Sequence, residues 1–301
     1  MQGVSGRAVH LSMYWNDKLL AVGSGFIGQL NDEDFLITSR HNLAGRNWET
    51  NELLSTWSVE PTRVVLRMQT SKPGVVEWTN RELPLLDEDE LPLWYEHPEL
   101  GRNADVAVLP IQRDEAYFVD AYDIARPAPA DEPTLSAGDG LFVVGYPRGF
   151  TPHVGIPVWV RASVASEPSV GFRGLPLYLV DSRTTDGQSG SAVVLRPGVN
   201  RSIRMRDGSI TATDLDDSWI AGVYSGRVNL LDARPITVTT SEGDEVTIPS
   251  ERFDIGLVWT TGAILAAADG RTRFPATGEG GAHWEPFEDW TGSYDDEVVA
   301  D

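Results

Sequence analysis

The chain contains no cysteine. Disulfide bonds therefore cannot stabilise it, and metal sites built on thiolates are excluded. It also lacks any run of about 18 apolar residues, the length that a membrane-spanning helix needs. Near its start, no basic residues precede an apolar stretch and a cleavage site, so we expect no signal peptide. These absences predict a cytoplasmic location.

Basic residues are also scarce. The sequence has 24 Lys and Arg against 45 Asp and Glu, which gives a formal net charge of -21. Phosphate recognition needs clustered Lys and Arg, so nucleic acid is disfavoured as a partner. An anionic membrane surface is disfavoured for the same reason. We interpret the negative charge as a source of solubility, which carries no information about the fold.

The residues that are present favour an all-β fold. Hydrophobic residues make up 41% of the 301 positions, enough for one large domain or two small ones. Short β-rich runs alternate with turns drawn from 29 Gly and 19 Pro. The pattern predicts hairpins from residues 8–15 with 18–22, 24–29 with 34–38, and 63–69 with 75–79. A single helix is predicted at 261–268, where a hydroxyl residue caps the start and Gly270 ends it.

A Pro-rich stretch without strand patterning divides the chain. We predict an N-terminal unit at residues 1–115, a linker at 116–137, and a C-terminal unit with the helix at 138–270. An acidic tail follows at 271–301, and its last part contains Trp284, Phe287, Trp290 and Tyr294. This tail is interpreted either as a flexible end or as a segment that docks through its aromatic residues on this or another protein.

A serine lies in a glycine-flanked turn between two predicted strands, in Gly187-Gln188-Ser189-Gly190-Ser191. Glycine allows backbone angles that a side chain forbids, so the Ser189 hydroxyl is free to point outward. The amides of Gly187 and Ser189 can then converge on a developing oxyanion. The alternative is an ordinary Gly/Ser turn of a β protein. The spacing differs from the nucleophile elbow of α/β-hydrolases, which has glycines two residues to either side of the serine.

A serine nucleophile needs a base, and imidazole is suited to that role near neutral pH. Of the five histidines, only His41 follows the end of a predicted strand in a hydroxyl-containing motif; the others are His10, His97, His153 and His283. Asp105 directly precedes an apolar run, where a carboxylate needs a partner, and an imidazole suits it. It could equally cap backbone amides at a strand start. No histidine spacing or acidic cluster favours a metal site.

Three blocks together resemble the chymotrypsin/trypsin-like serine protease family. They are Thr38-Ser39-Arg40-His41-Asn42, Ala104-Asp105-Val106-Ala107-Val108-Leu109, and the turn around Ser189. Their order is the order of that family, and the resemblance extends over about residues 8–268. The absence of cysteine resembles its bacterial-type members. The resemblance implies two six-stranded antiparallel β-barrels with a cleft between them and a C-terminal helix.

The resemblance also implies roles for individual residues. His41 would be the general base, Asp105 would orient it, and Ser189 would be the nucleophile, with the Gly187 and Ser189 amides as the oxyanion hole. No cofactor is implied.

Substrate would bind along Ser225, Gly226 and Arg227, where Ser225 also supports the aspartate. Arg227 replaces a glycine found in many members, so we hypothesise that it narrows the primary pocket or favours an acidic side chain; the alternative is a solvent-facing arginine. Gln188 replaces the aspartate that animal members use in zymogen activation, so that activation is not expected.

Three functional hypotheses follow. The first is a serine endopeptidase that cleaves polypeptide substrates. The second is a protease fold that has lost activity and serves as a binding module. The third is an intracellular protease of a stress or defence system that stays silent until a regulatory protein docks, an idea motivated by the aromatic acidic tail.

Overall fold

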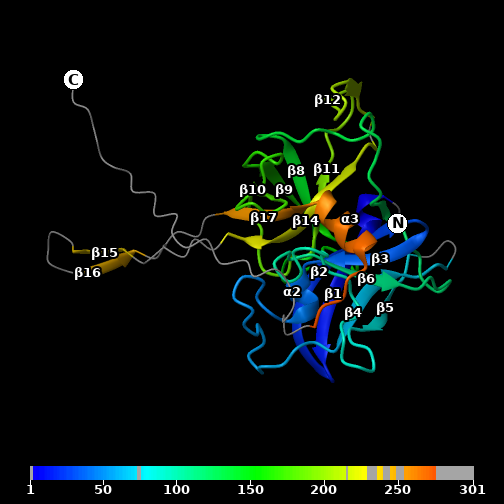
Figure 1. Cartoon of the computed structure of the whole chain (residues 1–301), viewed down its shortest axis with the longest axis vertical. Coiled ribbons are helices and arrows are strands. Elements are labelled where there is room, and N and C mark those ends of the chain that lie inside the picture. Colours follow the sequence, from blue (N-terminus) through cyan, green and yellow to red (C-terminus); the bar gives the residue numbers. More distant parts are fainter. Residues whose placement is uncertain are drawn as a thin grey trace.

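The computed structural model describes residues 3–72, 76–214, 216–228, 236–239, 245–248 and 254–275. The part of the predicted tail from residue 276 onward lies outside this range. Figure 1 shows two β-rich halves, with the first half in blue to cyan and the second in green to orange. The helix near the end of the described chain, α3 (Thr261–Gly270), is drawn in orange between them.

The first half is a curled sheet of seven strands. Six of them follow the order β5-β4-β1-β2-β3-β6, and β7 pairs in parallel with β2. The strands are β1 (Ala8–Trp15), β2 (Lys18–Leu30), β3 (Glu33–Thr38), β4 (Arg63–Gln69), β5 (Trp78–Pro84), β6 (Ala107–Ile111) and β7 (Tyr122–Asp123). Two short helices accompany them, α1 (Val4–Arg7) before β1 and α2 (Arg40–Ala44) after β3.

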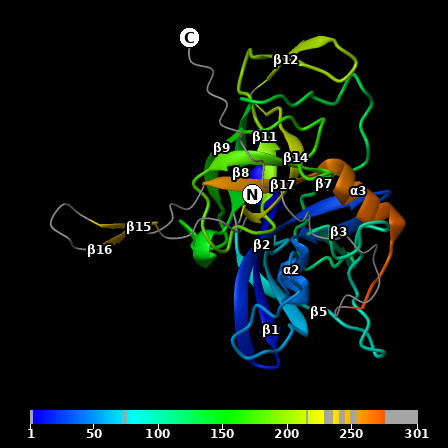
Figure 2. The same cartoon turned by 60° about the vertical axis from the view of Figure 1, so that its left-hand side comes forward.

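The second half is a closed barrel in the order β10-β17-β14-β11-β8-β9. Its strands are β8 (Gly140–Gly145), β9 (Val158–Val164), β10 (Leu177–Ser182), β11 (Ala192–Leu195), β14 (Trp219–Arg227) and β17 (Ile255–Thr260). Two further hairpins are β12 (Ser202–Arg204) with β13 (Ile210–Ala212), and β15 (Ile236–Thr239) with β16 (Glu245–Ile248). A 3-10 turn, η1 (Pro147–Gly149), follows β8. Figure 2 shows the β12 hairpin projecting from this half.

The predicted all-β fold with two halves and a C-terminal helix is confirmed. The barrel of the second half has the predicted six strands. In the first half the ladder leaves β5 and β6 unpaired with each other, so this sheet is curled but does not close. The irregular chain between them partly fills the gap, since the Leu93 amide bonds to the Leu85 carbonyl and Tyr95 pairs with Val108 of β6.

The three predicted hairpins of the first half form, as β1 with β2, β2 with β3 and β4 with β5, but two strand boundaries differ from the prediction. Residues 18–22 and 24–29 were predicted as separate strands, but both belong to β2, which pairs with β1 from Lys18 to Phe26 and with β3 from Phe26 to Leu30. Gly23 lies inside the ladder with β1, opposite Leu11, and a Cβ added there would lie 2.9 Å from the Asn42 amide. The strand predicted at 75–79 is also displaced, since β5 begins at Trp78 and runs to Pro84.

The C-terminal helix forms where the sequence predicts it. The Thr260 hydroxyl accepts a hydrogen bond from the Ala263 amide at 3.3 Å and so caps the first turn. None of the helices in the described part of the chain combines the length and hydropathy that a bilayer crossing requires.

An apolar cluster joins the two halves and α3. It combines residues of the first sheet such as Phe26 and Val108 with Trp259 of the barrel and Ile264 of α3, all fully buried. Separate clusters fill the interior of each half. The shared cluster fixes the two halves against one another, so groups at the edges of both sheets hold constant positions across their junction.

Candidate functional site

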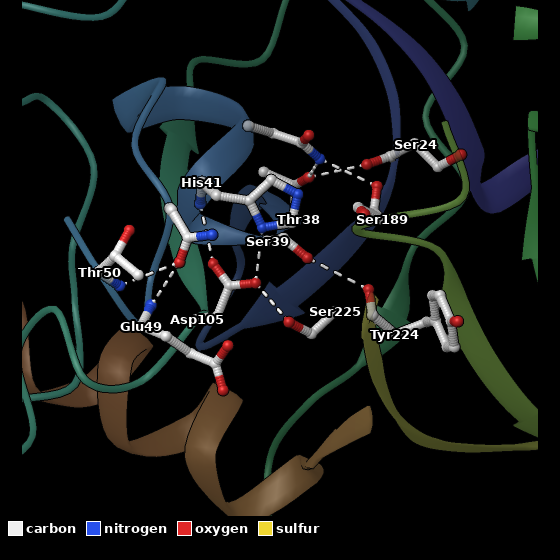
Figure 3. Close-up of polar contacts among 12 residues, drawn as sticks. Ser24, Thr38, Ser39, His41, Glu49, Thr50, Asp105, Ser189, Tyr224 and Ser225 are labelled. Carbon is white, nitrogen blue, oxygen red and sulfur yellow. Dashed lines mark hydrogen bonds and ion pairs between the residues drawn. The ribbon is translucent and has the colours of Figure 1, made fainter. Parts of the chain in front are cut away.

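His41 and Asp105 meet because of strand register. Thr38 at the end of β3 pairs with Ala107 at the start of β6, so the residues just outside these positions lie at the same edge of the sheet. The backbone amide of His41 donates to Asp105 Oδ1 at 2.8 Å, and His41 Nδ1 lies 2.7 Å from Asp105 Oδ2 (Figure 3). The carboxylate therefore holds both the backbone and the ring of the predicted base.

Asp105 is fully buried and has a third partner from the other half of the molecule. The Ser225 hydroxyl on β14 donates to Asp105 Oδ2 (Figure 3). Burial by itself would raise the pKa of Asp105, but the charge and hydrogen bonds of His41 and the hydrogen bond from Ser225 hold that pKa below its ordinary value. The aspartate is therefore ionised at neutral pH.

Ser189 is anchored to the first half through its backbone. The Ser189 carbonyl accepts from the Ser24 amide at 3.0 Å and from Asn42 Nδ2 at 2.9 Å. The next amide, that of Gly190, donates to the Tyr224 carbonyl of β14 at 2.7 Å. Figure 3 shows the second ring nitrogen of His41 on the side of the ring that faces Ser189. Within the described residues, no hydrogen bond joins the two side chains.

The orientation of the peptide before Gly187 is fixed by η1. The Arg148 amide donates to the Asp186 carbonyl at 2.6 Å. In a trans peptide the C=O and N–H point in opposite directions, so the Gly187 N–H points away from Arg148. Across the part of the chain that the structure describes, the amides of Gly187 and Ser189 donate to no protein acceptor. These two groups are thus available to an oxygen from outside the protein.

Gln188 stabilises the Ser189 turn from its buried side. It is fully buried, and its Oε1 accepts from the Thr185 amide at 2.9 Å. Near the start of the described chain, the Gly3 amide donates to a residue other than Gln188, namely Asp120, whose Oδ2 accepts at 2.7 Å. The expectation that Gln188 does not take part in a zymogen-type activation remains a prediction.

Arg227 does not point simply into solvent. Its guanidinium donates to the Thr184 carbonyl and lies 3.9 Å from Asp254 Oδ1, with 28% of the side chain exposed. The side chain thus crosses from β14 to the segment that leads into the Ser189 turn. Next to it, a Cβ added at Gly226 would meet nothing within 4 Å, which leaves open space on this stretch of β14.

The other described histidines have other surroundings. His10 lies in β1 with its ring edge-on to Tyr146 at 5.4 Å, and burial and the charge of Arg67 lower its pKa. His97 Nδ1 accepts from the amides of Glu99 and Leu100 at 3.3 Å. His153 is exposed, and His283 lies outside the described residues. Among the described residues, no three His, Asp or Glu side chains are placed to hold a metal ion.

Sequence reasoning missed several residues that build this site. Ser24, Asn42 and Arg148 hold the Ser189 turn, and Ser39 donates to the Tyr224 carbonyl at 3.1 Å. A signal existed for two of them, because Ser24 stands between two glycines and Asn42 directly follows His41. Arg148 offered no comparable signal, since its contribution comes from its backbone.

Comparison with known proteins gives one family and several solved structures. A model described as the trypsin-like peptidase domain matches residues 23–199, more than half of the chain. No curated protein matches the sequence. The active form of the Rv3671c protease from M. tuberculosis is similar with 15% identity, covering 88% of this chain and 80% of that one, with a TM-score of 0.42. The serine endoprotease from Yersinia pestis is similar with 14% identity, covering 88% of this chain and 62% of that one, with a TM-score of 0.45.

Proposed function

Because the chain belongs to the trypsin-like peptidase family, we propose that it is a serine endopeptidase with His41, Asp105 and Ser189 as its catalytic triad. The observation that carries this proposal is the position of the buried Asp105 carboxylate on His41 Nδ1 at 2.7 Å. A carboxylate there keeps the proton on Nδ1, so the other ring nitrogen presents a lone pair. That lone pair is what a serine nucleophile requires of its base.

The reaction follows from these roles. His41 takes the proton of the Ser189 hydroxyl as Oγ attacks the carbonyl carbon of the scissile bond. The Gly187 and Ser189 amides donate to the resulting oxyanion. His41 then gives its proton to the leaving amine, which leaves an acyl ester on Ser189. Water, deprotonated by His41, attacks this ester and regenerates the hydroxyl. The substrate backbone binds as an added strand beside Ser225 and Gly226.

The second candidate is a protease fold that binds without cleaving. The lack of a hydrogen bond between His41 and Ser189 in the described chain favours it. In apo enzymes, however, such bonds are often long and tighten only when substrate is bound. The endopeptidase is therefore the first candidate, and covalent labelling distinguishes it from the binding module. The cytoplasmic location stays a prediction.

The test is covalent labelling with a fluorophosphonate, which reacts with an activated serine. We expect labelling of the wild type and none of Ser189→Ala or His41→Ala. Ser191→Ala is a matched control, because Ser191 lies in the same turn and is fully buried. It should label like the wild type. A folded wild type that does not label contradicts an endopeptidase that is active alone and favours the binding module or a missing activator. Labelling that persists in Ser189→Ala shows that Ser189 is not the labelled serine.

The position of Arg227 predicts which substrate side chains the primary pocket prefers. Its guanidinium spans the gap between β14 and Thr184, so it narrows the space beside Ser189 and places a positive charge there. We expect the wild type to cut a peptide library after small or acidic residues in preference to basic ones. Arg227→Gly should reduce that preference by about tenfold or more. Arg227→Lys keeps the charge and separates its effect from that of size. A library cut equally well after acidic and basic residues would count against the assignment.

We also propose regulation by a protein partner through the tail. The first residues of the tail are fixed to the first half, because the Thr272 carbonyl accepts from the Glu96 amide at 2.9 Å and Arg273 pairs with Asp87. Deletion of residues 276–301 keeps these anchors. We expect it to change the labelling rate or the affinity for a partner by about fivefold or more, the usual lower range of coupling between sites. A deletion that changes neither would remove the support for this regulation.

A further inference from the structure

An open groove of about 950 Å³ lies where the two halves and α3 meet. Its lining comes from the segment between residues 121 and 135, from the start of β14 and from α3, and Figure 2 shows β7, β14 and α3 close together. None of His41, Asp105 and Ser189 lines this groove. Trp219, at its edge, is about 20 Å along β14 from Ser225, at about 3.3 Å for each residue. The groove is therefore separate from the proposed catalytic site.

Large apolar side chains line the groove without being fully covered by the protein. They are Leu135, Trp219, Ile220 and Leu265, and each is only partly buried. The Trp219 indole nitrogen donates to the Asp131 carbonyl at 3.1 Å, so the polar end of this side chain is satisfied and its ring remains available to an apolar partner. Apolar side chains gathered in a concave surface are typical of a binding site.

The walls of the groove are held in place by the rest of the protein. On one side β7 pairs with β2, and the Ile124 amide donates to the Gln29 carbonyl at 3.0 Å. Arg206, from the turn between β12 and β13, pairs with Glu132 on the same wall. On the other side, Ile264 fixes α3 in the apolar cluster that joins the two halves. The groove is thus formed before a partner binds, which lowers the entropic cost of docking.

The charges in the groove are mainly negative. Six charged residues line it: Asp123, Asp131, Glu132, Asp269, Arg7 and Arg126. Two of them are already neutralised, since Arg7 pairs with Asp120 and Glu132 with Arg206. In the part of the chain that the structure describes, the other three carboxylates form no ion pair. Arg126 is the one remaining basic group of the lining, so the groove keeps an excess of negative charge.

This charge distinguishes between possible occupants. Residues 276–301 contain eight acidic residues and no Lys or Arg, so the tail would be repelled. A second copy of the chain, with its net charge of -21, would bring two acidic surfaces together. We propose that the groove docks a segment of a partner protein that combines aliphatic or aromatic side chains with Lys or Arg. Docking there does not require catalysis by Ser189.

The test is fluorescence anisotropy with a labelled peptide of about 14 residues built from Leu, Trp and Lys. The full-length chain is used as Ser189→Ala, so that the proposed nucleophile cannot cut the peptide. We expect saturable binding that weakens as salt is raised. Replacing Lys by Glu in the peptide, or Leu and Trp by Ser, should weaken binding by about tenfold or more.

A pair of charge variants locates the binding. Asp131→Asn/Asp269→Asn should weaken it by about fivefold or more. Glu88→Gln/Asp89→Asn removes two exposed carboxylates from a loop outside the groove and should change the affinity by less than about twofold. Equal weakening by the two pairs would mean attraction to the acidic surface as a whole and would overturn the proposal.

A matched pair tests the apolar part of the groove. Leu265→Ser should weaken binding by about fivefold or more, whereas Ile210→Ser, at a side chain 71% exposed on β13, should leave it unchanged. Thermal unfolding checks that each variant folds, and if Leu265→Ser does not, the charge variants decide.

Two further outcomes are distinguishable. If deletion of residues 276–301 tightens peptide binding by about tenfold or more, the tail is the occupant and the partner segment is ruled out. A wild type that fluorophosphonate does not label counts against the endopeptidase and leaves the anisotropy result unaffected.

Discussion

Asp105→Asn should react with a fluorophosphonate about 10,000-fold more slowly than the wild type at neutral pH, while remaining folded. Three donors converge on the carboxylate: the His41 amide on Oδ1, and the His41 ring and the Ser225 hydroxyl on Oδ2. The backbone amide is always a donor, so the asparagine carbonyl must take the Oδ1 position. Its NH2 group then faces His41 Nδ1.

That arrangement fixes the wrong tautomer. Nδ1 must accept from the asparagine NH2, so the ring proton moves to the nitrogen on the Ser189 side, which can no longer receive the serine proton. The Ser225 hydroxyl can rotate and accept instead of donating, so no buried group loses its partner and the fold should be kept. The measurement is the second-order rate of inactivation, with thermal unfolding as the check on folding.

Ser225→Ala separates the effect of the His41 tautomer from the effect of hydrogen bonding to Asp105. It removes one donor from Asp105 but leaves the carboxylate on Nδ1, so we expect a loss of no more than about 100-fold. If Asp105→Asn keeps its rate within about tenfold of the wild type, Asp105 does not orient the base. Equal losses in both variants would show that support of the carboxylate, and not the tautomer, is what the site requires.

The sequence predicts the parts of this site that depend on short motifs. His41, Asp105 and Ser189 stand in blocks of a few residues whose strand context is readable, and the structure brings His41 and Asp105 into contact through the pairing of β3 with β6. The all-β fold follows in the same way, because alternation along a strand is a local pattern.

Other features depend on contacts between distant segments and leave no local pattern. The pairing of Arg40 with Glu96 requires knowing that residue 96 runs beside β6 next to α2. The continuity of β2 through Gly23 depends on pairing with β1, where Gly23 lies opposite Leu11. The gap between β5 and β6 depends on how an irregular segment of the chain packs. In each case a tertiary contact overrides the local preference on which the prediction was based.

Gly190→Ala should lower the free energy of unfolding by about 2–5 kcal/mol. Gly190 has φ +86°, a region that costs a residue with a side chain about 1–2 kcal/mol. An added Cβ would lie only 2.1 Å from the Ser24 carbonyl oxygen and from the Thr38 hydroxyl, and both residues are fully buried. Relief of such crowding in a packed interior adds about 1–3 kcal/mol.

Gly198→Ala provides the matched comparison for Gly190→Ala. Gly198 has nearly the same angle, φ +87°, but a Cβ there would meet nothing within 4 Å. Its alanine variant should therefore lose only the stability that the strained backbone angle costs, about 1–2 kcal/mol. It should keep the wild-type labelling rate. Urea unfolding of the two variants measures the difference. Equal losses would show that backbone strain alone explains both, so close packing against Ser24 would not be what holds the Ser189 turn in place.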